Sequence, residues 1–240
     1  MVTVGVVLML ILIVLVHEFA HILTAKTFGY KLKKLYIGIP ISINIKGRKY
    51  SATLWKVERN GVEYGVSWLI LGGAVDFHEK PNARWWHELL IALMGPVSNL
   101  LLAFLGIALV VGLGQAWTAS GMIFQLVLEG MAKMVTPEGI STMVGPIGFI
   151  SEVTIMVKGN FLNWLLMWSL INMALFVTNI LPIPALDGGH ILLSFIVAIF
   201  GEKAKIPARV ISYTFLYVLC GLMELILAKE IWFFLLGLLT

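Results

Sequence analysis

Two histidines and a glutamate near the N-terminus are the side chains best suited to chemistry. His17 and His21 are four residues apart, so on a helix both imidazoles lie on one face and can bind a single metal ion. Glu18 follows the first histidine directly, which puts its carboxylate within reach of water beside that ion, as a general base. This HExxH pattern predicts a zinc site. The structural alternative is a buried polar cluster that joins helices.

A third protein ligand must come from elsewhere, because a catalytic zinc commonly has three and keeps one position for water. The single cysteine, Cys220, lies in an apolar run, so histidine or carboxylate must supply that ligand. The candidates are His78 and His87, before or at the start of the second long apolar segment, and Asp187, which follows the third. Prolines and paired glycines in the segment 182–189 let the chain bend inward around Asp187. The structural alternative for Asp187 is the N-cap of the next helix.

The composition places the chain in a membrane. Of its 240 residues, 60% are hydrophobic and 12% charged, and the mean hydropathy is +0.96, which leaves too few polar side chains for a water-facing surface. The net charge of +4 does not indicate nucleic-acid binding, because no basic patch is interleaved with aromatic residues. Ionisable residues inside a span are costly and by default functional, which disfavours a purely structural role for HExxH.

Long apolar runs predict an α-helical membrane protein with about four transmembrane helices in a single domain, 1–240. Each crossing needs about 20 residues, so four crossings use roughly 80 to 90 residues and leave over half the chain outside the membrane. A large separate catalytic domain is not expected. HExxH lies about two thirds of the way along the first helix, within the membrane zone. The predicted spans are residues 2–25, 89–113, 161–181 and 207–227.

The connections between the spans contain shorter elements. Alternating apolar residues in the segment 32–77, with turn dipeptides Lys46-Gly47 and Asn60-Gly61, predict a small antiparallel β meander against or within the membrane surface. Residues 121–135 carry polar side chains at four-residue intervals, a narrow stripe that predicts a helix on the membrane surface. The remaining segments, a turn with a short helix and an apolar tail of unassigned placement, are residues 182–200 and 231–240.

The basic residues predict the orientation of the chain. Fourteen of the 17 Lys and Arg residues lie between the first and second spans or between the third and fourth. The positive-inside rule then puts these two connections in the cytoplasm and both termini outside. HExxH would therefore lie toward the cytoplasmic side of the inner (cytoplasmic) membrane.

The motifs together resemble one known family. After the third span, residues 179–190 are Asn-Ile-Leu-Pro-Ile-Pro-Ala-Leu-Asp-Gly-Gly-His. With HExxH inside a span, this segment resembles the site-2 protease family of intramembrane zinc metalloproteases, and most closely its bacterial branch that cleaves anti-sigma factors. Further matches extend the resemblance over most of the chain: Leu71-Gly72-Gly73, Gly95-Pro96-Val97-Ser98-Asn99 and Gly145-Pro146-Ile147-Gly148.

The resemblance implies a zinc site with defined ligands. His17, His21 and Asp187 would bind one Zn²⁺ ion, and Glu18 would act as the base. His190 is not a ligand in that family and is expected to be structural.

The resemblance also implies how a substrate would be held. Asn179 would lie near the substrate backbone or the developing oxyanion, and the meander, with Gly72 and Gly73, would pair with an unwinding substrate by strand addition. The chain departs from the family in two respects. Only some 47 residues separate the second and third spans, too few for the PDZ modules of the anti-sigma-cleaving members. Where related third spans often carry an extra asparagine, this chain has Ala174, with Asn172 nearby, seven residues before Asn179.

The expected activity is that of an intramembrane zinc endopeptidase. Its substrate would be a single-span membrane protein or peptide in the lipid bilayer, such as an anti-sigma factor or a signal-peptide remnant. No sequence pattern specifies the oligomeric state. The alternative is a zinc transporter or metal-binding membrane protein, but only Glu152 and Glu224 remain as carboxylates along a route, and neither has a histidine at ligand spacing. A scaffold that binds helices without cutting them would not need Glu18.

Overall fold

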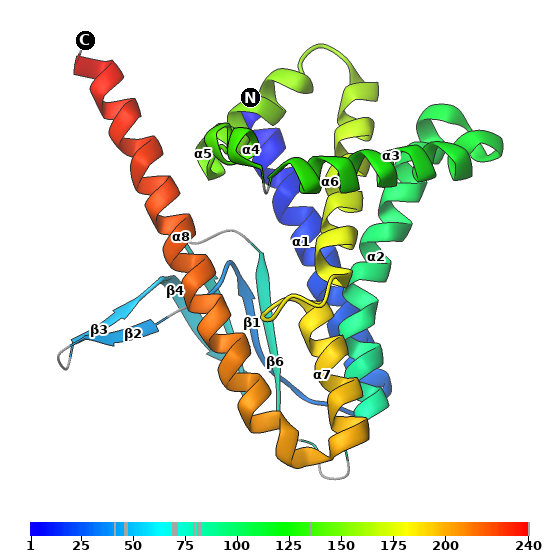
Figure 1. The fold of residues 1–240 in the computed structure, drawn as a ribbon, viewed down its shortest axis with the longest axis vertical. Coiled ribbons are helices and arrows are strands. Elements are labelled where there is room, and N and C mark those ends of the chain that lie inside the picture. Colours follow the sequence, from blue (N-terminus) through cyan, green and yellow to red (C-terminus); the bar gives the residue numbers. More distant parts are fainter. Residues whose placement is uncertain are drawn as a thin grey trace.

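The computed structural model describes residues 1–40, 42–45, 48–68, 72–78, 80, 83–134 and 136–239, and most of them are helical. Four helices of this described part are long and apolar enough to cross a membrane. Three stand side by side as a bundle, and the fourth stands apart from them (Figure 1). These helices are α1 (Val2–Thr27), α2 (Trp85–Val111), α6 (Phe161–Ile180) and α8 (Lys205–Leu239).

Helix α1 buries one continuous stripe against the rest of the bundle. Its buried positions recur every three to four residues, from Val6 through Ile13 to His17 and His21, which is the spacing of one helix face. The upper part of the stripe packs with α6 and with α5 (Pro146–Met156) in an apolar cluster that includes Val153. The two histidines lie at the lower end of the same buried face. Apolar packing of the upper part therefore fixes the orientation of this face within the bundle.

Helix α2 contacts both α1 and α6. A Cβ atom at Gly106 would overlap the Ser169 side chain of α6, so the glycine allows the two helices to approach closely. The Trp168 indole N–H of α6 also donates to the Leu102 carbonyl of α2, at 3.3 Å. These contacts align α6 with α2, and α6 also packs directly against α1 in the apolar cluster.

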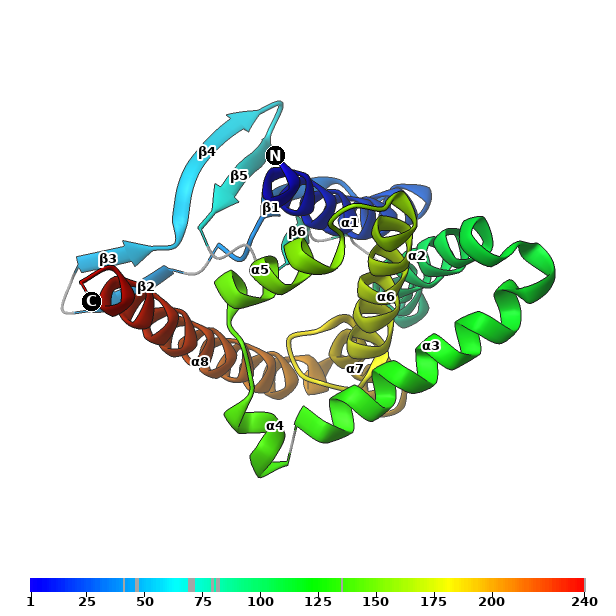
Figure 2. The same ribbon diagram turned by 90° about the horizontal axis from the view of Figure 1, so that it is seen from above.

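Helix α3 (Leu113–Met134) begins earlier than the predicted surface helix 121–135. Gly112 has φ 80°, a left-handed conformation that glycine adopts without strain, and it ends α2 and turns the chain at once into α3. In the view from above, α3 runs along one side of the bundle toward α4 (Figure 2). A short helix, α4 (Pro137–Ser141), follows before α5.

The segment between α1 and α2 is not the antiparallel meander predicted from the sequence. Four strands form a mixed sheet in the order β4-β5-β1-β6, in which β1 and β5 are parallel, and β2 and β3 form a separate hairpin. The chain leaves β1 through that hairpin and returns through β4, so that β5 reaches β1 in the same direction. The strands are β1 (Leu32–Ile37), β2 (Ser42–Ile45), β3 (Arg48–Ser51), β4 (Thr53–Arg59), β5 (Val62–Ser67) and β6 (Gly73–Phe77).

The turn predicted at Asn60-Gly61 is confirmed. Both residues have positive φ, 53° and 74°, and they join β4 to β5 as an antiparallel hairpin. This is the backbone conformation for which Asn-Gly is selected in two-residue hairpins. The turn predicted at Lys46-Gly47 lies outside the described residues.

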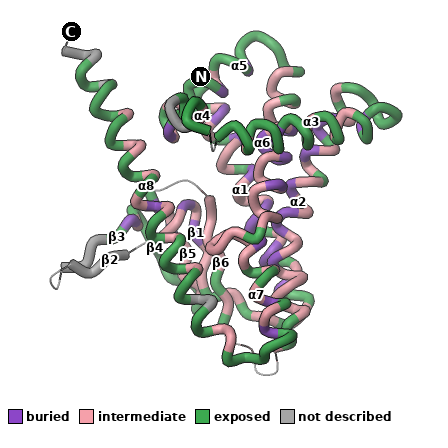
Figure 3. The backbone as a smooth tube through the Cα atoms, viewed as in Figure 1, coloured by how far each residue is buried: buried purple, intermediate pink, exposed green. Residues whose placement is uncertain are grey.

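Helix α8 is one long helix where the sequence predicted a span over 207–227 and a separate tail. It follows α7 (Asp187–Phe200) and a 3₁₀ turn, η1 (Glu202–Ala204), and most of its length is exposed (Figure 3). At its start, the Lys205 ammonium lies 2.8 Å from Glu88 of α2 and 3.0 Å from Glu202. Charged contacts therefore fix its lower end to the bundle.

Near its far end, α8 is held by the carboxylate of Glu230. This carboxylate accepts hydrogen bonds from the backbone N–H groups of Gly145, Ile147 and Gly148 at 2.8, 3.1 and 2.9 Å. A Cβ atom on Gly148 would come within 2.8 Å of the same carboxylate, which accounts for a glycine there. A negative charge is favourable at the N-terminus of a helix such as α5, so Glu230 ties α8 to α5.

Candidate metal centre

Helix α1 supplies three buried ionisable side chains at the lower end of the bundle. His17, Glu18 and His21 are each 8% exposed. The helix continues past them to Thr27 without a break, as the HExxH interpretation requires. Their burial at the α1–α2 contact places the pattern inside the protein and not on its surface.

Asp187 reaches the same point from the chain segment after α6. Pro182 and Pro184 lie between α6 and α7, and Ala185 is held at φ 73°, a strained conformation for a residue with a side chain. A Cβ at Gly188 would overlap the Leu181 carbonyl, so this glycine lets the first turn of α7 fold back on the segment. Asp187 is the first residue of α7 and not its N-cap, which is Leu186.

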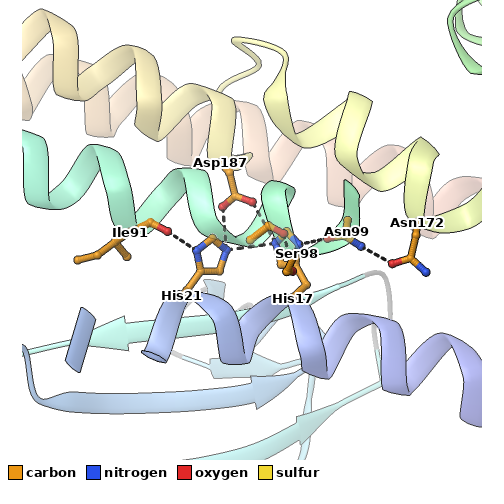
Figure 4. A network of polar contacts seen from close by, with 8 residues as sticks. His17, His21, Ile91, Ser98, Asn99, Asn172 and Asp187 are labelled. Atoms are coloured by element: carbon orange, nitrogen blue, oxygen red, sulfur yellow. Dashed lines mark hydrogen bonds and ion pairs between the residues drawn. The ribbon is translucent and has the colours of Figure 1, made fainter. Parts of the chain in front are cut away.

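The three side chains converge on one point (Figure 4). His17 Nε2 lies 3.0 Å from Asp187 Oδ2, and His21 Nε2 lies 3.3 Å from Asp187 Oδ1. The two Nε2 atoms are 3.2 Å apart. All the ligand atoms lie within 4.8 Å of one another, and among the described residues this is the single group of three that can hold a metal ion.

The donor set fits a cation better than a network of hydrogen bonds. His21 Nδ1 donates to the Ile91 carbonyl at 2.6 Å, which leaves His21 Nε2 as a bare lone pair in the neutral imidazole. Asp187 Oδ2 is buried and has no hydrogen-bond donor among the described residues, although His17 Nε2 is close to it. Two imidazole nitrogens and a carboxylate that face one another without a proton need a shared positive charge. This set of ligands suits zinc.

Gly95 of α2 keeps the space around the two histidines open. A Cβ atom there would overlap the ring of His21 and would lie 2.7 Å from His17 Nε2. The first glycine of the Gly95-Pro96-Val97-Ser98-Asn99 motif thus has a steric explanation. Any side chain at this position would push the imidazoles out of their present geometry.

Glu18 lies against the first residue of β6. The backbone N–H of Gly73 donates a hydrogen bond to the Glu18 carboxylate, and a Cβ on Gly73 would collide with that side chain. Gly72 has another role in the structure, because its carbonyl accepts from the Gly38 N–H at 2.7 Å. The structure therefore brings Gly73, and not Gly72, to the predicted base.

The other residues considered from the sequence lie outside the cluster. Asn179 is half-buried in the last turn of α6, and no described contact joins it to the three clustered side chains. His87 stacks on Phe28 with ring centroids 4.6 Å apart. His78 and His190 are exposed. The structure thus separates Asp187 from the two alternative histidine candidates.

Two residues beside the cluster have contacts for which the sequence provided no role. Asn99 of α2 forms a hydrogen bond with the Nδ1 atom of His17, and Asn172 of α6 forms one with Asn99 (Figure 4). Both asparagines are 0% exposed. The sequence signals that could have indicated them are a primary amide in the middle of a predicted span, the motif match that ends at Asn99, and the place of Asn172 near the extra asparagine of related third spans.

Comparison with known proteins identifies relatives of this chain. The protein Cj1068 of Campylobacter jejuni is 36% identical over 102 residues, which are 41% of this chain and 27% of that protein. The zinc metalloprotease RasP of Bacillus licheniformis is 33% identical, and the regulator of sigma-W protease RasP of Bacillus subtilis 31% identical, each over 86 residues. These segments are 35% of this chain and 20% of each RasP sequence, so the match covers a minor part of the relatives' length.

A family model matches far more of the chain than any of these relatives. The model of Peptidase family M50 matches residues 5–223. This range contains HExxH in α1, the contacts from α2 and α6, and Asp187 at the start of α7. The chain therefore belongs to Peptidase family M50, the family of the site-2 proteases, as the sequence motifs predicted.

Proposed function

We propose that this protein is a zinc endopeptidase of the site-2 protease type, which hydrolyses a peptide bond within or near a transmembrane helix of a membrane-protein substrate. The observation that carries the proposal is the convergence of His17, His21 and Asp187 within 4.8 Å, with Glu18 beside them. Family membership supports the same chemistry. The relatives named as zinc metalloproteases are similar in their matched segments.

His17, His21 and Asp187 would hold the zinc ion. When bound, zinc supplies Lewis acidity, which lowers the pKa of water to about 7 and polarises a carbonyl group. Glu18 would take the proton of the attacking water and return a proton to the leaving amine. The Gly73 N–H group fixes the orientation of the Glu18 carboxylate for both transfers. The burial of Glu18 keeps bulk water away from the reacting groups.

The free edge of β6 would hold the substrate. Among the described strands, β6 pairs with β1 on one side and with no strand on the other. Its first residue, Gly73, is in contact with Glu18, so a segment added at this edge would pass beside the base. Strand addition also solves a chemical problem, because the amides of a helix are shielded until the helix unwinds. Asn179 would bind the backbone of the extended segment, as the family motif implies.

The protein would cross the inner membrane four times, with both termini outside. The basic connections and the sheet would then lie on the cytoplasmic side, together with the metal centre. Water would enter from that side. The mixed sheet would lie at membrane depth only where protein or water covers its edges, because an open edge cannot face lipid.

A transporter is less well supported. A route for ions needs successive sites, whereas the described residues form one cluster of three ligands. Glu152, one of the two remaining candidates, is exposed on α5 and belongs to no such cluster.

The test is cleavage of a single-span peptide by the purified full-length chain in nanodiscs. We expect one zinc per chain, cleavage that a chelator abolishes, and a cut site within or beside the apolar segment. Glu18→Gln should keep the zinc and lose cleavage, because glutamine still accepts the Gly73 N–H but cannot take a proton. Glu152→Gln is the matched control and should cleave normally. Cleavage by Glu18→Gln at the normal rate, or in the presence of chelator, would contradict the assignment.

A further inference from the structure

A chain of buried hydrogen bonds leads from the metal centre into the bundle. His17 Nδ1 is hydrogen-bonded to Asn99 Oδ1. Asn99 Nδ2 donates to Asn172 Oδ1 at 3.0 Å, and Asn172 Nδ2 donates to the backbone carbonyl of Trp168 at 2.8 Å. These hydrogen bonds, which we call the relay, join α1, α2 and α6. Figure 4 shows the relay as a line from the histidine pair through Asn99 to Asn172.

The far end of this chain determines the direction of every bond in it. A backbone carbonyl can only accept, so Trp168 fixes the amide nitrogen of Asn172 toward itself and the amide oxygen toward Asn99. That oxygen in turn requires the nitrogen of Asn99, whose own oxygen must then face His17. An amide oxygen is also only an acceptor, so His17 must place its ring proton on Nδ1. His17 Nε2 is left as a lone pair directed at Asp187.

We propose that Asn99 and Asn172 are positioning residues that lock His17 in the Nδ1–H tautomer, so that its Nε2 atom is always available to bind metal. The proposal rests on the metal centre of the proposed function. His21 obtains the same tautomer directly from the Ile91 carbonyl, on the other side of the cluster. The two histidines therefore present matching lone pairs for different structural reasons.

The relay makes metal binding depend on how α6 packs against α2. Asn172 does not touch His17, and it acts only by holding the amide of Asn99 in one of its two orientations. If Asn99 turned over, its NH₂ group would face Nδ1, and the ring proton would move to Nε2, where it would block the metal. Loss of a partner that orients a ligating histidine commonly weakens metal binding by about 10- to 100-fold.

The test compares zinc affinities of the full-length protein in detergent micelles, measured by competition with a chromophoric chelator. Asn99→Leu should weaken zinc binding by about 10- to 100-fold. Asn172→Leu should weaken it in the same direction but less, because Asn99 can still adopt the correct orientation part of the time. The double variant should resemble Asn99→Leu alone, because residues in one network are not additive. Ser169→Ala is the control: it removes a buried hydroxyl of α6 that donates to Leu165, away from the relay.

A spectroscopic measurement identifies the tautomer itself. With ¹⁵N-labelled imidazoles, the wild-type protein should show His17 protonated at Nδ1, and the metal-free Asn172→Leu variant should show a mixture of both tautomers. A lost helix contact alone would not change the site of protonation. Because the wild-type spectrum needs no substitution, a His17 protonated at Nε2 would overturn the proposal even if a variant does not fold.

Three results would overturn the relay. The first is a wild-type His17 that carries its proton on Nε2 or binds metal through Nδ1. The second is an Asn172→Leu variant with the zinc affinity of Ser169→Ala, and the third is additive effects of the two single substitutions. Peptide cleavage is measured separately. A protein with the predicted tautomer and affinities that cuts no substrate would contradict the proposed function and leave the relay intact.

Discussion

The glycine of α2 that faces both histidines offers the sharpest test of the metal centre. In Gly95→Ala, the new Cβ would lie 2.7 Å from His17 Nε2, where an ordinary van der Waals contact is 3.4 to 4 Å, and would overlap the His21 ring. At least one imidazole must therefore move by roughly 0.7 Å or more, whereas zinc ligands tolerate deviations of about 0.2 Å.

The effect on folding should be far smaller than the effect on metal binding. Alanine in place of glycine favours a helix by about 1 kcal/mol, and overpacking in a core opposes folding by about 1–3 kcal/mol. The net change in the stability of the metal-free protein is thus at most about 2 kcal/mol. Zinc affinity should fall by at least about 100-fold, because losing one well-placed ligand is comparable to the largest effects of removing its orienting partner.

The assay measures zinc affinity by chelator competition, and the thermal unfolding of the metal-free protein as a check on folding. Gly130→Ala is the matched control, because a Cβ atom on this glycine of α3 would meet no other atom within 4 Å, and the residue lies in the same type of helix. It should bind zinc as the wild type does and be slightly more stable. A Gly95→Ala variant that folds and binds zinc with unchanged affinity would refute the placement of the site against α2.

Three further predictions concern the surroundings of the centre. Gly73→Ala should abolish peptide cleavage but retain zinc, because its Cβ would displace Glu18 and no ligand; normal cleavage would contradict the role of β6. Glu230→Gln should weaken the contact between α8 and α5, because a charge-assisted hydrogen bond contributes about 1.5–3 kcal/mol and a neutral one about 0.5–1.5 kcal/mol, and hydrogen exchange at the first amides of α5 should rise. The hydrogen bond from Tyr36, with those from Lys56 and Lys34, lowers the pKa of Glu63 from 4.5 to about 2. The sheet should therefore keep this stabilisation above about pH 4.5 and lose it as the pH falls toward 2, and the thermal unfolding of Glu63→Gln should lack that dependence.

The recognition of the family and of the long helices followed from short-range patterns. HExxH puts two imidazoles on one face because 3.6 residues make a helical turn, and α1 is one unbroken helix across it. The turn at Asn60-Gly61 followed in the same way from the positive φ angles that these residues tolerate. The predicted helix boundaries were less accurate, since α3 and α8 begin or end where caps and tertiary contacts allow.

The parallel pairing of β1 with β5 could not be predicted from the alternation of apolar residues. Alternation indicates which face of a strand is buried, but it does not determine which strand is its neighbour or in which direction that neighbour runs. Here the neighbours are set by a hairpin that leaves the sheet after β1 and by β6, which occupies the remaining edge of β1.

The sequence by itself determined that a membrane protein carries a pair of histidines and a glutamate on one face of its first helix, because covalent geometry imposes these local spacings. It also identified the family, because the family's motifs are short stretches of consecutive residues that can be recognised in the sequence alone. The family resemblance already favoured Asp187 over His78 and His87, and the tertiary structure placed it beside the two histidines of the first helix. Only the tertiary structure joined Asn99 and Asn172 to His17. Those contacts depend on how α2 packs against α1 and α6, and packing between distant segments leaves no periodic signal in the chain.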